Sequence, residues 1–318
     1  MKEIAIVGPG GLGGTFAALL GLTGQCAVTV VGRPGAHIDA IRASGLTITG
    51  QKEGVAHIAA VDDPTAVTAC DALIYVVKAQ DTAAVLAATA HIEVRDFAVS
   101  LQNGTVKDEL LVEAFGRDRV IGGVAVVAGE RPEPGRITWT YDGVTQFGEL
   151  DGSPSARVDY LVDLCNAAGL NTQASAAILA ATWTKMVGWI PIGLYATLAR
   201  QNNAAILSDP QMATGYVGMV RELSALARAR DIPLTNLGPY HIAAWNEGSE
   251  AEAIDKVMHS PLAGSQSTHS ACQDILRGQP TEFSACIGPM LEDATARGVA
   301  LPTVQALYAA LMGLERTL

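Results

Sequence analysis

The first fourteen residues join a short apolar run to a glycine-rich turn. Residues 4–7 suit a buried parallel strand, and Gly8, Gly10 and Gly13 follow with the spacing G-x-G-x-x-G. Residues 15–22 then predict an apolar helix. In such a unit the first glycine permits a tight turn, the second lets a pyrophosphate approach the backbone, and the third allows close helix–strand packing. The pattern predicts a Rossmann-type dinucleotide site; a glycine-rich turn without a ligand is the alternative.

The residues after the second predicted strand, 27–31, bear on the choice of cofactor. A site that prefers NAD places an acidic residue at this strand end, where it accepts hydrogen bonds from the ribose 2′-hydroxyl. Here the chain continues Gly32-Arg33-Pro34 and holds no acid. Because the planar guanidinium of arginine can pair with a 2′-phosphate, we expect NADP rather than NAD. A solvated surface arginine is the other interpretation of Arg33.

Two further strand ends carry polar side chains. Residues 71–77 predict a buried strand that ends at Lys78, and residues 97–101 predict another that ends at Gln102-Asn103-Gly104. Ligands bind at the carboxyl ends of strands in this kind of sheet. Lys78 is therefore either a contact for cofactor or substrate, or a solvated strand-end lysine. Asn103 either holds a nicotinamide and a substrate oxygen, or belongs to an ordinary Asn-Gly turn.

The rest of the first half suggests shorter strands. Residues 46–48 and 57–60 suggest an antiparallel pair, and His57 fits an edge strand better than a catalytic role. Residues 135–148 alternate between apolar and polar side chains, which indicates antiparallel strands at the end of the sheet.

The pattern changes near residue 174, where strand signals stop and alanine-rich helical segments begin. We therefore expect an α/β fold in which an N-terminal Rossmann-type dinucleotide-binding domain, residues 1–173, precedes an all-α C-terminal domain, residues 174–318. The helices predicted in the second domain cover residues 176–199, 217–230, 239–246, 251–258, 282–297 and 302–315, with a further one before Gly278.

Composition narrows the class of protein. The 318 residues are 49% hydrophobic and 17% charged, which is enough apolar material for a large core. A net charge of −11 disfavours nucleic acid as a partner, and no apolar stretch is long enough to span a membrane. Five cysteines without a C-x-x-C pair predict neither a disulfide framework nor a metal site. We expect a cytoplasmic protein with a small-molecule partner, and its apolar helices are compatible with a homodimer.

The helix predicted over residues 176–199 carries one lysine, Lys185. Burying an ammonium group is costly unless it has a partner or a task, and burial lowers the pKa of lysine toward the range useful for proton transfer. A lysine that extends to the surface is the alternative. Trp189 and Gly193 lie four and eight residues further on, so they share its face if the helix is continuous.

Five stretches of the chain match the pattern of one enzyme family. They are Gly8-Pro9-Gly10-Gly11-Leu12-Gly13, residues 76–79, Gln102-Asn103-Gly104, Trp183-Thr184-Lys185 and, most specifically, Ser270-Ala271-Cys272-Gln273-Asp274 with residues 277–282. Through them the chain resembles the ketopantoate reductase (2-dehydropantoate 2-reductase) family of pantothenate biosynthesis. The resemblance implies a Rossmann domain, a helical domain, an active site between them, and reduction of a 2-keto acid to a 2-hydroxy acid by NADPH.

The resemblance also implies a role for each matched residue. Lys185 lies at the position of the family's general acid, which polarises the keto oxygen and delivers a proton as hydride arrives. Glu282 supports Lys185 or positions the cofactor, and Asn103 and Ser270 contact the substrate. The implied cofactor contacts are the glycine turn, residues 8–13, with Arg33, Lys78, Asn103 and Glu282.

Three positions depart from the family pattern. The family has asparagines four and eight residues after the lysine and three before the serine, where this chain has Trp189, Gly193 and Ser267. Losing polar anchors and gaining an indole favours a more apolar or bulkier substrate, such as an aromatic or branched 2-keto acid. Three interpretations stay open. The first is an NADPH-dependent 2-keto acid reductase, either a true ketopantoate reductase or a D-2-hydroxyacid dehydrogenase or other relative. The second is a related hydroxyacid or imine-forming dehydrogenase on the same two-domain plan, and the third is an NADP-binding sensor or scaffold that has lost catalysis.

Overall fold

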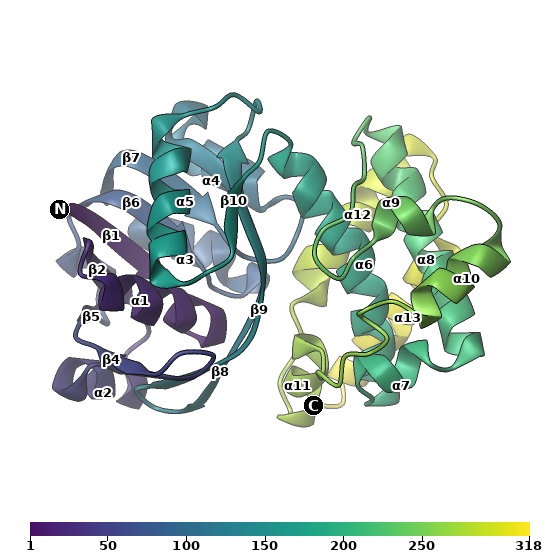
Figure 1. The fold of residues 1–318 in the computed structure, drawn as a ribbon, viewed down its shortest axis with the longest axis horizontal. Coiled ribbons are helices and arrows are strands. Elements are labelled where there is room, and N and C mark those ends of the chain that lie inside the picture. Colours follow the sequence, from purple (N-terminus) through teal and green to yellow (C-terminus); the bar gives the residue numbers. More distant parts are fainter. The chain divides into compact units, whose positions relative to one another are not determined.

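The computed structural model describes residues 1–318 and divides into two compact units, Met1–Ile178 and Leu179–Leu318. The first unit combines helices with a sheet and the second is built from helices (Figure 1). This confirms the predicted fold class. The division falls a few residues beyond residue 173, at the first turn of the long apolar helix.

A ten-stranded sheet forms the centre of the α/β unit. Its strands are β1 Lys2–Val7, β2 Cys26–Val31, β3 Leu46–Gly50, β4 Gly54–Ala56, β5 Ala59–Val61, β6 Ala69–Tyr75, β7 Glu93–Ser100, β8 Val120–Glu133, β9 Arg136–Glu149 and β10 Thr172–Ala174. In space the order is β4-β3-β9-β8-β7-β6-β1-β2-β5, with β10 beside β9. Strands β7, β6, β1, β2 and β5 are parallel, so the turns that follow them emerge at one edge of the sheet.

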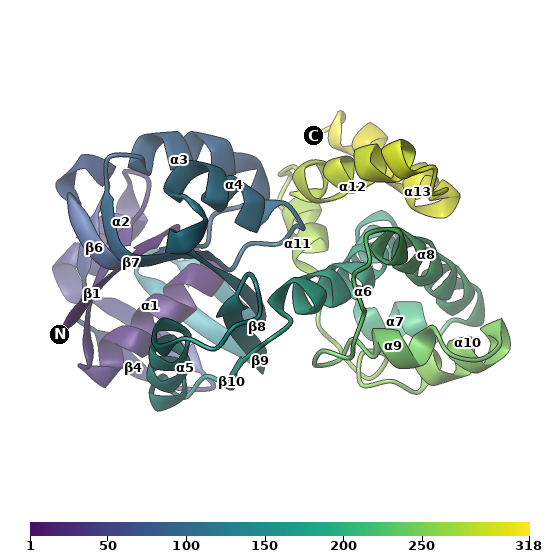
Figure 2. The ribbon, with the colours of Figure 1, turned by 90° about the horizontal axis from the view of Figure 1, so that it is seen from above.

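Helices cover both faces of the sheet, as a parallel sheet with two apolar faces requires. Helices α1 (Gly11–Thr23), α2 (Ala36–Ser44) and α5 (Ala156–Ala168) pack on one face, and α3 (Thr82–Thr89) and α4 (Lys107–Phe115) pack on the other. Figure 2 shows the sheet between α3 and α4 above and α1 and α5 below. Ile4 and Ile6 of β1 face the first layer, whereas Ala5 and Val7 face the second. Successive side chains of a strand point to opposite faces of the sheet, and here both faces are buried.

Two strands differ from the prediction. β3 has the expected antiparallel partner in kind but not in residues: it pairs with β4, residues 54–56, rather than with residues 57–60. Residues 59–61 form β5 and pair parallel with β2. His57 lies exposed between β4 and β5, so its assignment to an edge strand was wrong. β9 lies between β8 and β3 rather than at the end of the sheet. The alternation of apolar and polar side chains predicts that a strand exists, but the strand with which it pairs depends on residues far away in the chain.

The helical unit surrounds helix α6, Ile178–Ala199, which is buried on nearly every side. A helix that is apolar all round belongs in a core. The other helices are α7 Asn203–Leu207, α8 Pro210–Ala229, α9 Ile242–Trp245, α10 Glu250–Met258, α11 Ser270–Leu276, α12 Phe283–Arg297 and α13 Pro302–Glu315. Helix α6 runs through Pro191 without a break, so side chains four and eight residues apart share a face.

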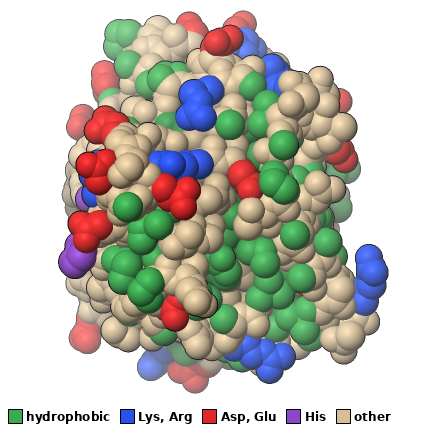
Figure 3. Space-filling view, turned by 90° about the vertical axis from the view of Figure 1, so that its right-hand side faces the viewer, with side chains coloured by type: hydrophobic (Ala, Val, Ile, Leu, Met, Phe, Trp, Pro, Cys, Tyr) green, Lys and Arg blue, Asp and Glu red, His purple; other side chains and the backbone are tan.

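The face drawn in Figure 3 is mixed in character. On the face of the helical unit in Figure 3, acidic and basic side chains lie near one another at the upper left, and apolar side chains gather below them. The basic side chains form no continuous surface on this face. None of the helices combines the length and the apolar character needed to cross a membrane.

Candidate active site

The glycine turn, residues 8–13, joins β1 to α1, and its glycines serve different purposes. Gly8 has a φ of 94°, in the left-handed region that favours glycine. A Cβ on Gly13 would overlap the carbonyl oxygen of Gly8, so only glycine lets the helix pack this closely. By contrast, a Cβ on Gly10 would meet no atom within 4 Å. The space beside Gly10 is open, as the approach of a diphosphate to the backbone requires.

Helix α1 begins directly beside this open space. Its N-cap is Gly10, and no side chain caps it. The backbone N–H groups of the first turn and the positive end of the helix dipole therefore face outward, where negative charge is stabilised. A Cβ on Gly11 would overlap the carbonyl group of Gly129 on β8, which shows how closely the helix start is fixed to the sheet. Leu12 packs against the core. These features fit the diphosphate of a dinucleotide.

His37 on α2 holds the glycine turn in place, and the sequence analysis did not single it out. Its Nδ1 accepts a hydrogen bond from the N–H of Gly135 at 2.9 Å, so Nε2 carries the proton of the neutral ring and donates to the Pro9 carbonyl at 2.8 Å. Burial lowers the pKa of His37; the bond to Pro9 opposes this shift, and the charge of Arg131 adds to it. The neutral ring thus links the turn to the loop between β8 and β9.

The other cofactor residues predicted in the first unit follow strands of the same parallel set. Arg33 is exposed just after β2, Lys78 is half-buried after β6, and Asn103 is half-buried after β7. Because β1, β2, β6 and β7 run parallel, these three residues and the glycine turn lie at one edge of the sheet. The structure therefore brings the predicted cofactor residues of this unit to one edge.

A buried polar network positions the turn that carries Asn103. The side chain of Gln102 accepts a hydrogen bond from the Ser100 hydroxyl at 2.8 Å. Lys107, buried at the start of α4, donates to the Ser100 carbonyl at 3.1 Å and to Asp108 at 2.7 Å. The sequence analysis missed Lys107, because a Lys-Asp pair at a helix start is usually solvated. Together these bonds fix where the chain leaves β7.

In the helical unit, Lys185 lies in the middle of α6 with 8% of its surface exposed. Trp189 and Gly193 follow on the same helical face, as their spacing predicts. Glu282, the N-cap of α12, is also 8% exposed. Burial raises the pKa of the Cys286 thiol, the carboxylate of Glu282 adds to this, and the ammonium of Lys185 opposes it. Cys286 lies one turn after Glu282 on α12.

Three rings form an aromatic cluster, which consists of Trp189, His269 and Phe283. Ring centroids are 4.6 Å apart for Trp189 and His269 and 5.1 Å apart for Trp189 and Phe283. A Cβ on Gly193 would lie 2.5 Å from Cε1 of His269 and 2.6 Å from the Phe283 ring. The glycine at 193 thus makes room for two of the rings. Ser267 and Ser270 flank His269 in the chain and are exposed.

His269 caps α11 and is held in one tautomer. Its Nδ1 accepts a hydrogen bond from the N–H of Ala271 at 3.1 Å, so Nε2 carries the proton of the neutral ring. Nε2 is buried without a hydrogen-bond partner. Burial lowers the pKa of His269 to about 3; the backbone carbonyl of Trp189 opposes this shift, and the charge of Lys185 adds to it. His269 is missing from the sequence-based site, where only its place beside Ser270 pointed to it.

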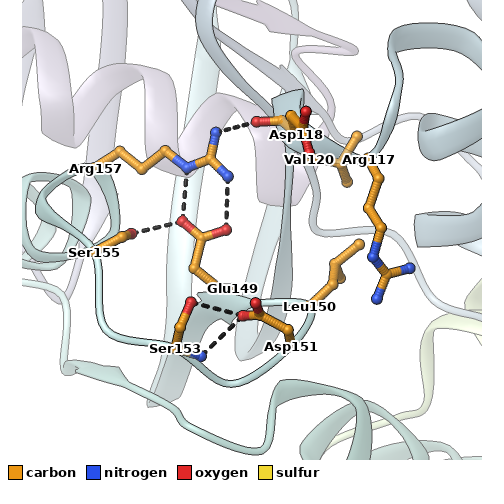
Figure 4. Close-up of a pocket in the computed structure, with 9 residues that line it drawn as sticks. All are labelled: Arg117, Asp118, Val120, Glu149, Leu150, Asp151, Ser153, Ser155 and Arg157. Atoms are coloured by element: carbon orange, nitrogen blue, oxygen red, sulfur yellow. Dashed lines mark hydrogen bonds and ion pairs between the residues drawn. The ribbon is translucent and has the colours of Figure 1, made fainter.

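A polar surface pocket of about 420 Å³ is lined by none of the predicted site residues (Figure 4). Arg157 donates to both carboxylate oxygens of Glu149 at 2.6 Å, and the Ser155 hydroxyl donates to the same carboxylate at 2.6 Å. Asp151 accepts two hydrogen bonds from Ser153. Because these groups are paired with one another, the pocket favours a structural role for them over ligand binding.

We expect Arg157→Ala to destabilise the α/β unit by about 3 kcal/mol at neutral pH, because it leaves a partly buried carboxylate without its partner. The hydrogen bond from Arg157 is the largest cause that lowers the pKa of Glu149 below 4.5. The pKa of Glu149 is lower in the folded protein than in the unfolded chain. The ion pair therefore contributes its full stability to the fold above pH 4.5, and this contribution is lost as the pH falls through the folded-state pKa.

Urea unfolding of the wild type and the variant between neutral pH and pH 3 measures this effect. Arg95→Ala is the matched control, since Arg95 pairs with Glu3 on the exposed surface and such pairs contribute about 0.5 kcal/mol. Equal unfolding midpoints for Arg157→Ala and the wild type at neutral pH would contradict the expectation.

A Rossmann-type unit followed by a helical unit is an architecture of dinucleotide-dependent oxidoreductases. Residues 4–152 match the family described as ketopantoate reductase PanE/ApbA, and residues 177–315 match the C-terminal domain of the same family. The chain belongs to the ketopantoate reductase family. The resemblance seen in the sequence is therefore confirmed, and the chain is an enzyme.

Individual relatives agree with this assignment. The 2-dehydropantoate 2-reductase of Halobacterium salinarum is 26% identical over 309 residues, which cover 96% of both chains. The crystal structure of a PanE/ApbA family ketopantoate reductase from Ralstonia eutropha has a TM-score of 0.84 and 23% identity, over 99% of both chains. The ternary structure of D-mandelate dehydrogenase with NADH and anilino(oxo)acetate has a TM-score of 0.86 and 20% identity, also over 99% of both chains. These two structures support the fold.

Proposed function

We propose that the chain reduces a 2-keto acid to a 2-hydroxy acid with NADPH, and that Lys185 is the general acid. Family membership supports the reduction of a keto acid. The observation that carries the mechanism is the burial of Lys185 in the middle of the apolar helix α6, with 8% of its surface exposed. A buried ammonium group needs a partner or a task, and donating a proton is a task that the family chemistry requires.

The residues of the glycine turn would hold the dinucleotide, which supplies hydride when bound. The open space at Gly10 and the uncapped start of α1 fit its diphosphate. Arg33 would pair with the 2′-phosphate, and Lys78 would contact the cofactor from the next strand end. Asn103 would bind the nicotinamide amide and the substrate.

Lys185 would donate a hydrogen bond to the keto oxygen. The keto oxygen would take the proton of the Lys185 ammonium group and become the product hydroxyl, while the carbonyl carbon would accept the hydride that the bound dinucleotide supplies. The neutral amine then regains a proton from solvent. Glu282 would orient Lys185, and Ser270 would contact the substrate carboxylate. The same lysine would serve the reverse reaction as general base.

We infer that the substrate has an apolar or aromatic side chain. Trp189 presents an indole, packed against Phe283, where family members have an amide. With an indole in place of that amide, the site has one polar partner fewer for a hydroxyl on the substrate side chain. The fold is shared with D-mandelate dehydrogenase, whose structure holds the aromatic ligand anilino(oxo)acetate. Reduction of ketopantoate is the alternative, and the names of relatives such as the Halobacterium salinarum enzyme favour it.

A panel of 2-keto acids, tested with NADPH and with NADH, distinguishes these activities. We expect phenylglyoxylate, phenylpyruvate or 2-ketoisovalerate to exceed ketopantoate in kcat/KM by about tenfold or more, because Trp189 replaces a polar anchor. We expect NADPH to be the better cofactor. A clear preference for ketopantoate would refute the apolar substrate, and the absence of turnover with every keto acid and both cofactors would refute the reductase.

A further inference from the structure

We propose that His269 is a specificity-determining residue of the keto-acid site, where its Nε2–H donates a hydrogen bond to a substrate oxygen in place of the asparagine that is absent at position 193. This inference rests on the function proposed above. It assigns a polar contact to a residue outside the family motif.

The His269 ring occupies the space into which a side chain at position 193 would extend. A Cβ at that position would lie 2.5 Å from Cε1 and 2.7 Å from Nε2 of the imidazole. These separations are too short for non-bonded atoms, so an asparagine at 193 and the observed ring cannot coexist without a shift. Because position 193 on α6 is a glycine, the His269 ring at the start of α11 can lie against the same face of α6.

Nε2 of His269 forms no hydrogen bond of normal geometry in the protein, although the Trp189 carbonyl acts on the ring. The residue is 7% exposed, Nδ1 is used by the Ala271 N–H, and Nε2 is buried without a partner. Buried polar groups are nearly always hydrogen-bonded, so an exception of this kind points to a ligand that completes it. Packing against Trp189, with ring centroids 4.6 Å apart, holds the donor in one direction.

A 2-keto acid has oxygen atoms that can accept hydrogen bonds from both Lys185 and His269. Its keto oxygen and its carboxylate lie on adjacent carbons, so a ligand whose keto oxygen contacts Lys185 presents a carboxylate oxygen nearby. Lys185 lies one turn before Trp189 on α6, and the Trp189 indole packs on the His269 ring with centroids 4.6 Å apart. Because His269 is neutral over the whole physiological range, it offers a donor without adding a second positive charge. Trp189 then provides the apolar surface for the substrate side chain.

His269→Phe tests the donor, because it keeps an aromatic ring beside Trp189 and removes the N–H. We expect the KM for the best 2-keto acid to rise by about 10- to 100-fold, with a much smaller change in kcat and in the affinity for NADPH. His269→Gln retains a donor and should recover part of the loss. His259→Phe, at the exposed residue that follows α10, is the matched control and should behave as the wild type.

Binding of oxamate, a non-reducible analogue of a 2-keto acid, separates this inference from the proposed function. Quenching of tryptophan fluorescence should give a Kd about 10- to 100-fold weaker for His269→Phe than for the wild type. In the wild type, the Nε2–H proton signal should shift downfield in NMR spectra when oxamate binds. An unchanged Kd in a folded His269→Phe variant, an unmoved Nε2–H signal at saturation, or no oxamate binding by the wild type would overturn the inference. Oxamate binding without turnover of any keto acid would refute the reductase alone.

Discussion

Lys185→Ala is expected to lower kcat by about 10³-fold while the affinity for NADPH stays unchanged, because general acid catalysis contributes about 10²- to 10⁴-fold. Lys185 belongs to the helical unit, whereas the predicted diphosphate contacts belong to the glycine turn of the other unit. Lys185→Arg sharpens the test, since arginine keeps the positive charge and does not release a proton at neutral pH. Its kcat should stay close to that of the alanine variant.

Steady-state rates with the best keto acid, together with NADPH titration by fluorescence, measure both quantities. Lys256→Ala on α10 is the control, because Lys256 is exposed and remote in sequence from the site residues. Turnover by Lys185→Ala within tenfold of the wild type would remove Lys185 from the mechanism. A parallel loss of NADPH affinity would mean that the lysine acts mainly in cofactor binding.

Gly10→Ala is expected to weaken cofactor binding, whereas Gly13→Ala is expected to lower the stability of the protein. A Cβ on Gly10 meets no protein atom within 4 Å, so the unliganded variant should be as stable as the wild type. The added methyl would fill the space assigned to the diphosphate, and NADPH binding should weaken by about 100-fold. A Cβ on Gly13 overlaps the Gly8 carbonyl, so that variant should lose about 2 kcal/mol of stability before any cofactor is added.

Thermal unfolding with and without NADPH distinguishes the two variants. Gly10→Ala should keep the wild-type Tm without cofactor and lose most of the increase that NADPH produces. Gly13→Ala should start from a lower Tm. Gly24→Ala is the control at a helix end distant from the turn in sequence. Its positive φ predicts a small loss of stability and normal binding. Wild-type NADPH affinity in Gly10→Ala would contradict a diphosphate at the glycine turn.

Features that depend on neighbouring residues could be predicted from the sequence. The strand, turn and helix of residues 2–23 follow from glycine spacing and apolar runs, and α13 has the predicted bounds. The pairing of β5 with β2 and the interior place of β9 could not be predicted, because each depends on contacts between distant segments. The edge-strand assignment of His57 failed for the same reason.

In the candidate site, too, features set by neighbouring residues could be predicted, and features set by contacts between distant segments could not. Lys185, Trp189 and Gly193 share a face because of helical period alone, and the structure has them on one continuous helix. His269 could not be singled out, because its burial and tautomer arise where α6, the start of α11 and α12 pack together. His37 is a similar case, since its two hydrogen bonds join residues 9 and 135.

Deuterium transfer tests most directly whether a nicotinamide dinucleotide and Lys185 act on the same keto acid. NADPH labelled at either face of C4 would be incubated with phenylglyoxylate and the wild-type chain, and the hydroxy acid analysed by mass spectrometry. We predict one deuterium at C2 of the product from one of the two labelled forms, and about 10³-fold slower formation of that product by Lys185→Ala. Product without deuterium from both forms, or labelled product formed at the wild-type rate by Lys185→Ala, would contradict the proposed reduction.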